Sequence, residues 1–222
     1  MNNKTAKTEI VSSVVWKILE RGGNAVVQMV VQVVMARLLA PEQFGALAIM
    51  LVFVNLGNVV VQSGLNTALV QAPEADDDDF STVFWMSLAV SLALYVLVFA
   101  SAPAIAGFYA MPGLTWPLRA LALLFLVNAL NSVQVARVTR DLEMRKVFRS
   151  TMAAVAASAA AGIGLALAGA GLWALVAQQL AYQVASCAAL FLQVDWRPRL
   201  VFRRDRARAL FGFGWRLLAS GL

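Results

Sequence analysis

The stretch STMAAVAASAAAGIGLALAGAGLWALVAQQLAYQVASCAALFLQV, residues 150–194, contains no Asp, Glu, Lys or Arg over 45 positions. A helix needs about 20 apolar residues to cross the hydrocarbon core of a bilayer, so this stretch is too long for one crossing and long enough for two. Gly169-Ala170-Gly171, near its middle, is typical of a turn. The stretch therefore predicts an integral membrane protein with a pair of transmembrane helices over 150–169 and 172–193.

The rest of the chain is divided by its charges into further uncharged stretches of crossing length. They run over 22–36, 43–73, 80–118 and 120–136. With the pair above, they predict six transmembrane helices, the first four over 11–38, 46–70, 82–106 and 117–137. The fold class that we expect is all-α, a polytopic membrane helical bundle.

A seventh hydrophobic pattern begins at Leu210 and stops at Leu222, which is too short to cross a bilayer. We therefore expect a six-helix lobe over 1–209 and, over 210–222, the start of a seventh helix belonging to a further lobe of a longer protein. A cleavable signal peptide is the competing interpretation of the N-terminus. The apolar region 11–38 is longer than a usual signal h-region and contains Lys17, Glu20 and Arg21 within it, which disfavours cleavage.

Composition excludes several function classes. Hydrophobic residues make up 61% of the 222 residues and charged residues only 14%, and the mean hydropathy is +0.74, whereas a soluble domain carries about 25% charge. A water-soluble enzyme and a nucleic-acid binder are therefore disfavoured. The absence of histidine removes zinc–imidazole sites and Ser-His-Asp catalysis. The single cysteine, Cys187, is expected to be a buried small hydrophobe, and we expect no metal or cofactor.

Basic residues predict the orientation. With six crossings, thirteen Lys and Arg residues fall on the face that holds the N-terminus, the loop after 117–137 and the segment after 172–193, whereas Arg37 and Arg119 alone fall on the other. The positive-inside rule makes the first face, which holds the N-terminus, cytoplasmic. Within it, the stretch 137–149 is expected to be an amphipathic link on the inner leaflet. Asp76 to Asp79 are expected to form a solvated loop followed by a helix N-cap.

The first predicted helix carries a polar stripe. Its members recur at spacings of three and four, typical of one helix face, and are Ser13, Lys17, Glu20, Arg21, Asn24, Gln28 and Gln32. The two cations could snorkel to the headgroups with Glu20 as an intrahelical partner, or they could line a cationic cavity. Because snorkelling does not explain amides deeper in the bilayer, we favour the cavity, with Glu20 as the one carboxylate available for ion coupling.

Amide side chains recur on other predicted helices. They include Asn55, Asn58, Gln62 and Asn66 on 46–70, Asn128, Asn131 and Gln134 on 117–137, and Gln178, Gln179 and Gln183 on 172–193. Taken singly, each set is typical of hydrogen bonds between membrane helices. Taken together, they favour a hydrated central vestibule. The small residues at 158, 162, 166 and 170, four apart, predict close helix packing.

Four local patterns resemble one family. Residues 36–45, ARLLAPEQFG, resemble the turn between the first two helices of polysaccharide flippases. Three further matches follow in the same order, GLNTALVQ at 64–71, STVFW at 81–85 and GAGLWALVAQQ at 169–179. The whole chain is similar to the N-terminal half of a lipopolysaccharide or exopolysaccharide flippase of the multidrug/oligosaccharidyl-lipid/polysaccharide exporter superfamily.

The resemblance implies a protein of two helical lobes with a central cavity. It implies that the protein moves an undecaprenyl-pyrophosphate-linked oligosaccharide from the inner to the outer leaflet by alternating access, alongside polysaccharide polymerase or export partners. Basic cavity residues are common in such flippases, and Lys17 and Arg21 match that description. Sugar contacts are expected from the amides Asn24, Gln28, Gln32, Asn55, Gln62, Asn128, Asn131 and Gln179.

Three other classes stay open from the sequence. A multidrug or cation extruder of the same superfamily would favour acidic cavity residues, and Glu20 is the only candidate. A membrane glycosyltransferase would need a carboxylate or base at the outer face, where Glu42 stands alone. A non-catalytic accessory membrane protein is the last class, and it predicts that deletion leaves polysaccharide export unchanged.

Overall fold

The computed structural model describes residues 22–23, 25, 27–62, 76–140, 143–199 and 201, and within them it is built of helices without strands. The helices are α2 (Pro41–Gln62), α4 (Asp77–Phe108), η1 (Pro112–Leu114), α5 (Thr115–Leu121), α6 (Leu124–Arg140), α7 (Met144–Leu167) and α8 (Leu172–Gln193). A shorter apolar helical stretch, Val27–Leu38, precedes them.

The described residues contain 5 segments long and apolar enough to cross a membrane, namely α2, α4, η1 through α6, α7 and α8. The all-α class and the multi-pass membrane character are therefore confirmed. The count of six is not, because the first predicted helix is described only in part, and its continuation Val27–Leu38 is too short to count. The predicted seventh helix over 210–222 lies outside the described residues.

The two helices predicted over 150–169 and 172–193 are present in the structure as α7 and α8. Helix α8 spans 172–193 as expected, and α7 ends at Leu167, just before the predicted turn. Gly169 and Gly171 both have positive φ, at 75° and 57°, and glycine adopts this left-handed region without steric strain. The small-residue face of α7 packs on α8 as predicted, because a β-carbon at Gly162 would lie 3.0 Å from Gln178 Cβ.

Three predicted helix starts were too late. Helix α2 begins at Pro41 rather than 46, with proline at the first helical position where its missing N–H costs nothing. Helix α4 begins at Asp77 rather than 82, because Asp76 caps it. Helix α7 begins at Met144 rather than 150. The predicted amphipathic link over 137–149 is therefore wrong, since residues 137–140 continue α6 and residues 144–149 form the first turns of α7.

The predicted helix over 117–137 is broken within the membrane span. Leu123 N–H bonds the Ala120 carbonyl at 3.1 Å and Phe125 N–H bonds the Ala122 carbonyl at 3.0 Å, so i→i+3 bonds replace the α-helical pattern between α5 and α6. No proline or glycine stands at the break. Below the break, the Phe125 ring lies over Gly57 of α2, where a β-carbon would be 2.5 Å from Phe125 Cζ.

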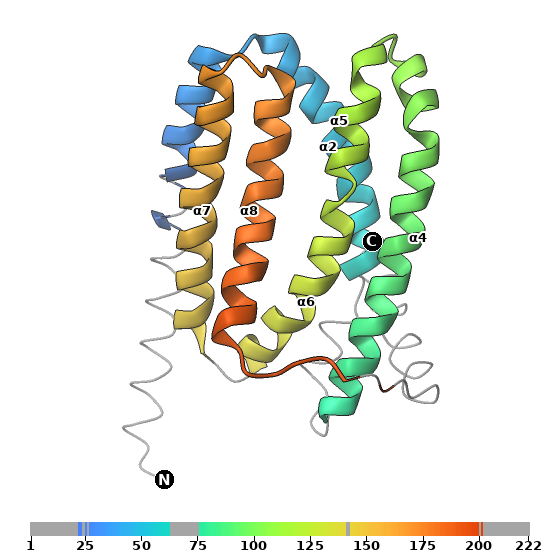
Figure 1. The fold of residues 1–222 in the computed structure, drawn as a ribbon, viewed down its shortest axis with the longest axis vertical. Helices are drawn as coiled ribbons and strands as arrows, with labels where there is room; N and C mark the ends of the chain where they lie inside the picture. Colours follow the sequence, from blue (N-terminus) through green and yellow to red (C-terminus); the bar gives the residue numbers. More distant parts are fainter. Residues whose placement is uncertain are drawn as a thin grey trace.

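The helices surround α6. In Figure 1 the pair α7–α8 lies on one side, α4 lies beyond α5 and α6 on the other, and α2 runs behind. Helix α6 packs against α2, α4, α7 and α8. Two apolar clusters fill the bundle, a large one that includes Met35, Met50 and Phe125 and a smaller one at one end that includes Phe80, Val133 and Trp196. Cys187 is buried, as predicted.

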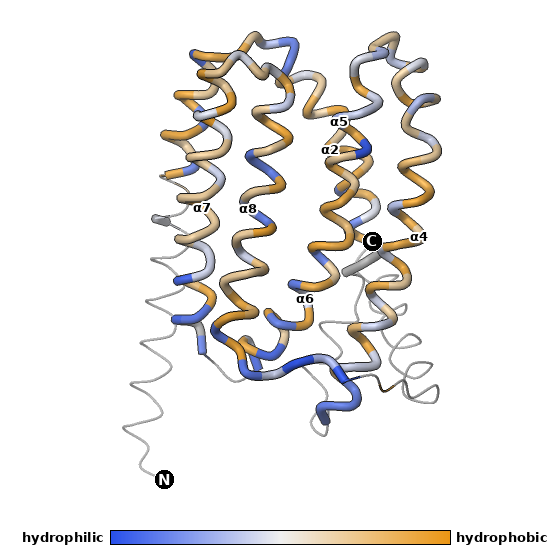
Figure 2. Tube along the Cα trace, in the orientation of Figure 1, coloured by the Kyte–Doolittle hydropathy of each residue, from blue (hydrophilic) through white to orange (hydrophobic). Residues whose placement is uncertain are grey.

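The two ends of the bundle differ in character. One end holds the start of α4, the end of α6, the start of α7 and the end of α8 (Figure 1). We call it the basic end for its described Lys and Arg residues, which are Arg137, Arg140, Arg145, Lys146, Arg149, Arg197 and Arg199. We call the other the aromatic end for its exposed Phe108, Tyr109, Trp116 and Trp173. Figure 2 shows hydrophilic residues gathered at the basic end and hydrophobic ones along the helices.

Candidate functional site

Helix α6 carries polar side chains into the interior of the bundle. Asn128, Asn131 and Gln134 follow one another at spacings of three, so they occupy one broad sector of the helix. Asn131 is 8% exposed and Gln134 is fully buried. A helix that contacts four others inside an apolar bundle cannot turn these amides to bulk water. They are therefore available to other helices or to a polar ligand.

The amide of Asn128 joins α6 to α2. Its Nδ2 donates to Oδ1 of Asn58 at 2.8 Å, between helices that come close where Phe125 covers Gly57. Asn58 was not among the predicted sugar contacts. Its spacing of three from Asn55 and four from Gln62 was the signal that could have found it. A hydrogen-bonded pair of amides leaves Nδ2 of Asn58 and Oδ1 of Asn128 with further capacity.

Three further amide atoms on α6 are buried without a hydrogen-bond partner in the part of the chain that the structure describes. These groups are Oδ1 of Asn131 and both Nε2 and Oε1 of Gln134. Buried amides without partners cost about 1–3 kcal/mol per group. The part of α6 from Asn128 to Gln134 therefore combines polar side chains with burial, and it is the centre of the candidate site.

Helix α8 carries three of the amides predicted above, and one of them, Gln178, packs against α7. Gln178 is buried with its stem against Gly162 of α7, so it serves packing between those helices. Gln179 and Gln183 share a helix face with Leu190, at spacings of four and seven, and Leu190 belongs to the same apolar cluster as Val133 of α6. Both glutamines are partly exposed. Neither forms a hydrogen bond with α6 in the described part of the chain.

The remaining predicted site residues are dispersed or lie outside the described residues. Asn55 is exposed on a face of α2 whose other exposed members are apolar, and Gln28 is half-buried and Gln32 exposed on the stretch Val27–Leu38. In the view of Figure 1 that stretch lies away from α6. Lys17, Glu20, Arg21 and Asn24 lie outside the described residues, as does the side chain of Gln62. The proposed pyrophosphate site stays a prediction.

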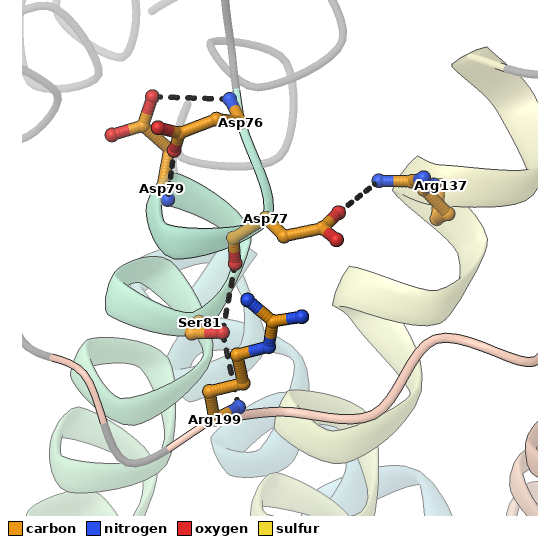
Figure 3. Close-up of polar contacts among 6 residues, drawn as sticks. All are labelled: Asp76, Asp77, Asp79, Ser81, Arg137 and Arg199. Carbon is orange, nitrogen blue, oxygen red and sulfur yellow. Dashed lines mark hydrogen bonds and ion pairs between the residues drawn. The ribbon is translucent and has the colours of Figure 1, made fainter.

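The acidic run at the basic end caps and ties helix α4. Asp76 Oδ1 accepts from Asp79 N–H at 2.8 Å and Asp79 Oδ2 accepts from Asp76 N–H at 3.4 Å, which is a capping box. Asp77 pairs with Arg137 of α6 at 2.8 Å. The predicted N-cap is confirmed at Asp76, but the predicted solvated loop is wrong, because Asp77 to Asp79 form the first turn of α4 and Asp79 is buried. One member of the run, Asp77, makes an ion pair between helices (Figure 3). No group of acidic, cysteine or histidine side chains that could hold a metal occurs among the described residues.

The segment after α8 is held against α4. Figure 3 shows Arg199 beside Ser81, whose Oγ accepts from the Arg199 N–H at 3.1 Å and donates to the Asp77 carbonyl at 2.8 Å. Trp85 Nε1 donates to the Arg199 carbonyl at 2.9 Å. The N–H and the carbonyl of Arg199 are thus bound by the side chains of Ser81 and Trp85, which lie one helical turn apart on α4. We call residues 194–199 the strap, since they cross from α8 to α4 at the basic end (Figure 1).

The strap also contributes aromatic packing. Trp196 lies edge-on to Phe80 and Phe84, with ring centroids 6.0 and 6.4 Å apart. Residues 81–85, one of the four patterns that resemble polysaccharide flippases, therefore supply the hydroxyl, the indole and one of the rings that hold the strap. Two of these patterns also meet each other, those at 36–45 and 169–179, because Gln43 Nε2 approaches within 2.9 Å of where a β-carbon at Gly171 would stand.

Comparison with known proteins identifies relatives over nearly the whole chain. The sequence model of the family described as polysaccharide biosynthesis protein matches residues 34–222. The succinoglycan biosynthesis transport protein ExoT of Rhizobium meliloti is 29% identical over 97% of this chain and 43% of its own length. The teichuronic acid biosynthesis protein TuaB of Bacillus subtilis is 26% identical over 74% of this chain and 34% of its own.

A third relative is the lipopolysaccharide biosynthesis protein WzxC of Escherichia coli, 26% identical over 56% of this chain and 25% of its own length. The chain thus spans less than half the length of these curated relatives. No solved structure matches it.

Proposed function

This chain belongs to the polysaccharide biosynthesis protein family, whose members include polysaccharide flippases, and from that premise we propose that it moves a lipid-linked oligosaccharide, carried on undecaprenyl pyrophosphate, from the inner to the outer leaflet of the bacterial inner membrane by alternating access. The observation that carries the proposal is the likeness along 97% of the chain to a succinoglycan biosynthesis transport protein. Its role is transport, not catalysis.

The physical problem of such transport suits the polar groups of this chain. A sugar headgroup with a pyrophosphate cannot enter hydrocarbon without losing its hydration, so the protein must offer replacement hydrogen bonds. Amides both donate and accept, as sugar hydroxyls do. The amides of α2, α6 and α8, with Asn58 and Asn128 at their centre, are proposed to supply these bonds, while the apolar lipid stays in the bilayer.

The pyrophosphate is assigned to Lys17 and Arg21, and the N-terminus and the basic end are assigned to the cytoplasm. Cations bind phosphate strongly in a site that excludes water. The basic end carries seven of the nine Lys and Arg residues that the structure describes, which supports a cytoplasmic location.

The test uses the complete open reading frame that contains this chain. Its deletion is expected to accumulate lipid-linked oligosaccharide on the inner leaflet and to abolish surface polysaccharide, and the wild-type gene should restore both. Lys17→Ala/Arg21→Ala should fail to restore them at normal expression. Lys4→Ala/Lys7→Ala is the matched control, because it removes the same charge before the polar stripe, and it should restore export.

Other outcomes decide against the proposal. Full export by the Lys17→Ala/Arg21→Ala variant would remove the pyrophosphate assignment. Unchanged polymer after deletion, together with new sensitivity to dyes, would replace the flippase by a multidrug extruder. Unchanged polymer without that sensitivity would leave an accessory membrane protein.

A further inference from the structure

Arg119 is the single charged residue between Asp79 and Arg137. It lies on α5, and its Nε donates to the Phe99 carbonyl of α4 at 3.1 Å. Helix α4 has 32 residues, and Phe99 lies between six and seven residues from its midpoint. At 1.5 Å per residue, this contact is about 10 Å from the middle of the helix. The hydrocarbon core reaches about 15 Å from its own middle, so the guanidinium lies within the depth of a bilayer centred on α4.

The guanidinium is held in place by α4 and α5. Its central carbon lies 4.2 Å from the centroid of the Phe99 ring and 5.0 Å from that of the Trp116 ring. Two cation–π contacts and one hydrogen bond fix its position and its plane. Arg keeps its charge under all conditions in proteins. Its two Nη groups have no hydrogen-bond partner among the described residues, so they retain donors for an anion.

The surface around Arg119 is apolar and exposed. Trp116 is 66% exposed, and Leu123 lies on the same face of the span one turn deeper in the bilayer. On α4, Val96 and Leu92 continue the exposed apolar surface from Phe99 toward the middle of the helix. Arg119 thus lies at the outer end of an exposed apolar surface that extends toward the middle of the bilayer. This surface is complementary to a molecule with an anionic head and a long alkyl chain.

We propose that Arg119, with Phe99 and Trp116, forms a binding site for the phosphate of a lipid whose chain lies along α4 and α5 over Val96 and Leu123. The planar fork of Arg matches phosphate oxygens with two parallel hydrogen bonds, and both aromatic rings hold it ready for them. A cation that merely snorkels to the surface would not be fixed to a carbonyl and two rings at this depth.

Two lipids carry the required chemistry. One is an anionic phospholipid of the bilayer, and the other is a prenyl pyrophosphate. The site itself rests on the geometry of Arg119, whereas a prenyl pyrophosphate as its occupant also rests on the proposed function. The experiment therefore tests the two lipids separately.

The full-length protein carries photoreactive benzoylphenylalanine at Leu123 and is reconstituted into phosphatidylcholine vesicles. The vesicles contain equal amounts of phosphatidylglycerol and diacylglycerol, which differ in the headgroup phosphate. Mass spectrometry measures the ratio of phosphatidylglycerol adducts to diacylglycerol adducts at the photoreactive residue. We expect the ratio at Leu123 to exceed that at Val184, an exposed position on α8, by about tenfold, the size of one or two charge-assisted hydrogen bonds. In Arg119→Gln the ratio should fall to the Val184 value.

A second arm replaces the two lipids by undecaprenyl pyrophosphate and undecaprenol. Enrichment in either arm supports the site, and the arm that shows it identifies the lipid. A protein that does not flip oligosaccharide would still show the phosphatidylglycerol enrichment, so failure of the proposed function is distinguishable.

Equal ratios at Leu123 and Val184 in both arms would overturn the site, as would a ratio at Leu123 that Arg119→Gln leaves unchanged. Among the described residues, Arg37 is the other cation outside the basic end, and Arg37→Gln should leave the ratio as it is. If Arg119→Gln does not reconstitute, Arg119→Met decides by the same ratio, because its apolar stem still covers both rings.

Discussion

At the residue scale, the closest approach between α2 and α6 depends on the missing side chain of Gly57. The Phe125 ring occupies the space that a β-carbon would take, 2.5 Å from Phe125 Cζ. The same approach brings Asn128 Nδ2 to Asn58 Oδ1 at 2.8 Å. The pair of amides at the centre of the candidate site is thus positioned by a glycine one residue away.

We expect Gly57→Ala to destabilise the protein, because the added methyl group forces the Phe125 ring or α6 to move. Overpacking of this kind costs about 1–3 kcal/mol, which thermal unfolding in detergent, followed by tryptophan fluorescence, would register as a lower melting temperature. Gly164→Ala on α7 is the control, since nothing lies within 4 Å of its added carbon. Phe125→Leu should restore stability to Gly57→Ala. A melting temperature equal to that of the wild type would show that α6 does not lie this close.

The spacing of amides in the sequence named candidate sugar contacts, whose role stays a prediction, but it did not predict how these side chains are held. Amides spaced by three and four residues are visible in a sequence, and Asn128, Asn131 and Asn55 were predicted in that way. That Asn128 bonds Asn58, while Asn55 lies exposed on another face of α2, depends on how two distant helices rotate and approach. A single sequence contains no signal for that contact. Gly57 lies in an apolar run, where nothing in the sequence shows that position 57 requires glycine rather than another small residue.

At the element scale, the membrane-spanning middle parts of the helices were predicted better than the helix ends. The uncharged stretches located α8 to the residue, because hydrophobicity is set by the bilayer. The starts of α2, α4 and α7 were placed five or six residues late, because charged or proline residues were taken as loop although Pro41 and the Asp76 capping box begin helices. No proline or glycine stands at the break between α5 and α6, so the sequence contains no signal that predicts it.

The strap is an element whose attachment can be tested by proteolysis. Ser81 and Trp85 bind both backbone groups of Arg199, so Ser81→Ala/Trp85→Phe should free this backbone while keeping an aromatic ring beside Phe84. Trypsin, applied to the protein in detergent, is expected to cut after Arg199 several times faster in this variant. Each lost hydrogen bond is worth about 1 kcal/mol. Arg197 precedes Pro198 and so does not compete as a cleavage site.

Trp173→Phe is the matched control for the strap, because Trp173 is an exposed tryptophan at the aromatic end. It should leave the cleavage rate after Arg199 unchanged. A rate in Ser81→Ala/Trp85→Phe that equals the wild-type rate would mean that the aromatic contacts of Trp196 alone hold the strap.

At the scale of the whole molecule, the alternation of helix directions gathers charges that are far apart in sequence. The end of α6, the start of α7 and the strap come from separate parts of the chain, yet all lie at the basic end (Figure 1). The sequence count of basic residues assumed this alternation. The five described spans agree with it, because the break at α5–α6 bends one span without reversing it.

This arrangement predicts the orientation of the protein in the membrane, which cysteine labelling can measure. The native Cys187 is buried, and Cys187→Ala removes the single thiol of these 222 residues; any cysteine elsewhere in the complete protein is replaced as well. In it, Gly113→Cys places a thiol at the aromatic end, in an exposed turn where an added side chain meets nothing within 4 Å. Asp195→Cys places one at the basic end, on an exposed residue of the strap.

A membrane-impermeant maleimide applied to intact cells should label Gly113→Cys and leave Asp195→Cys unlabelled until the membrane is permeabilised. The physical reason is that Lys and Arg near the ends of spans are retained on the cytoplasmic side, where anionic lipids also attract them. Labelling of both positions after permeabilisation is the control for accessible thiols. The reverse pattern would place the basic end outside, and with it the Lys17 and Arg21 assignment would lose its cytoplasmic starting position.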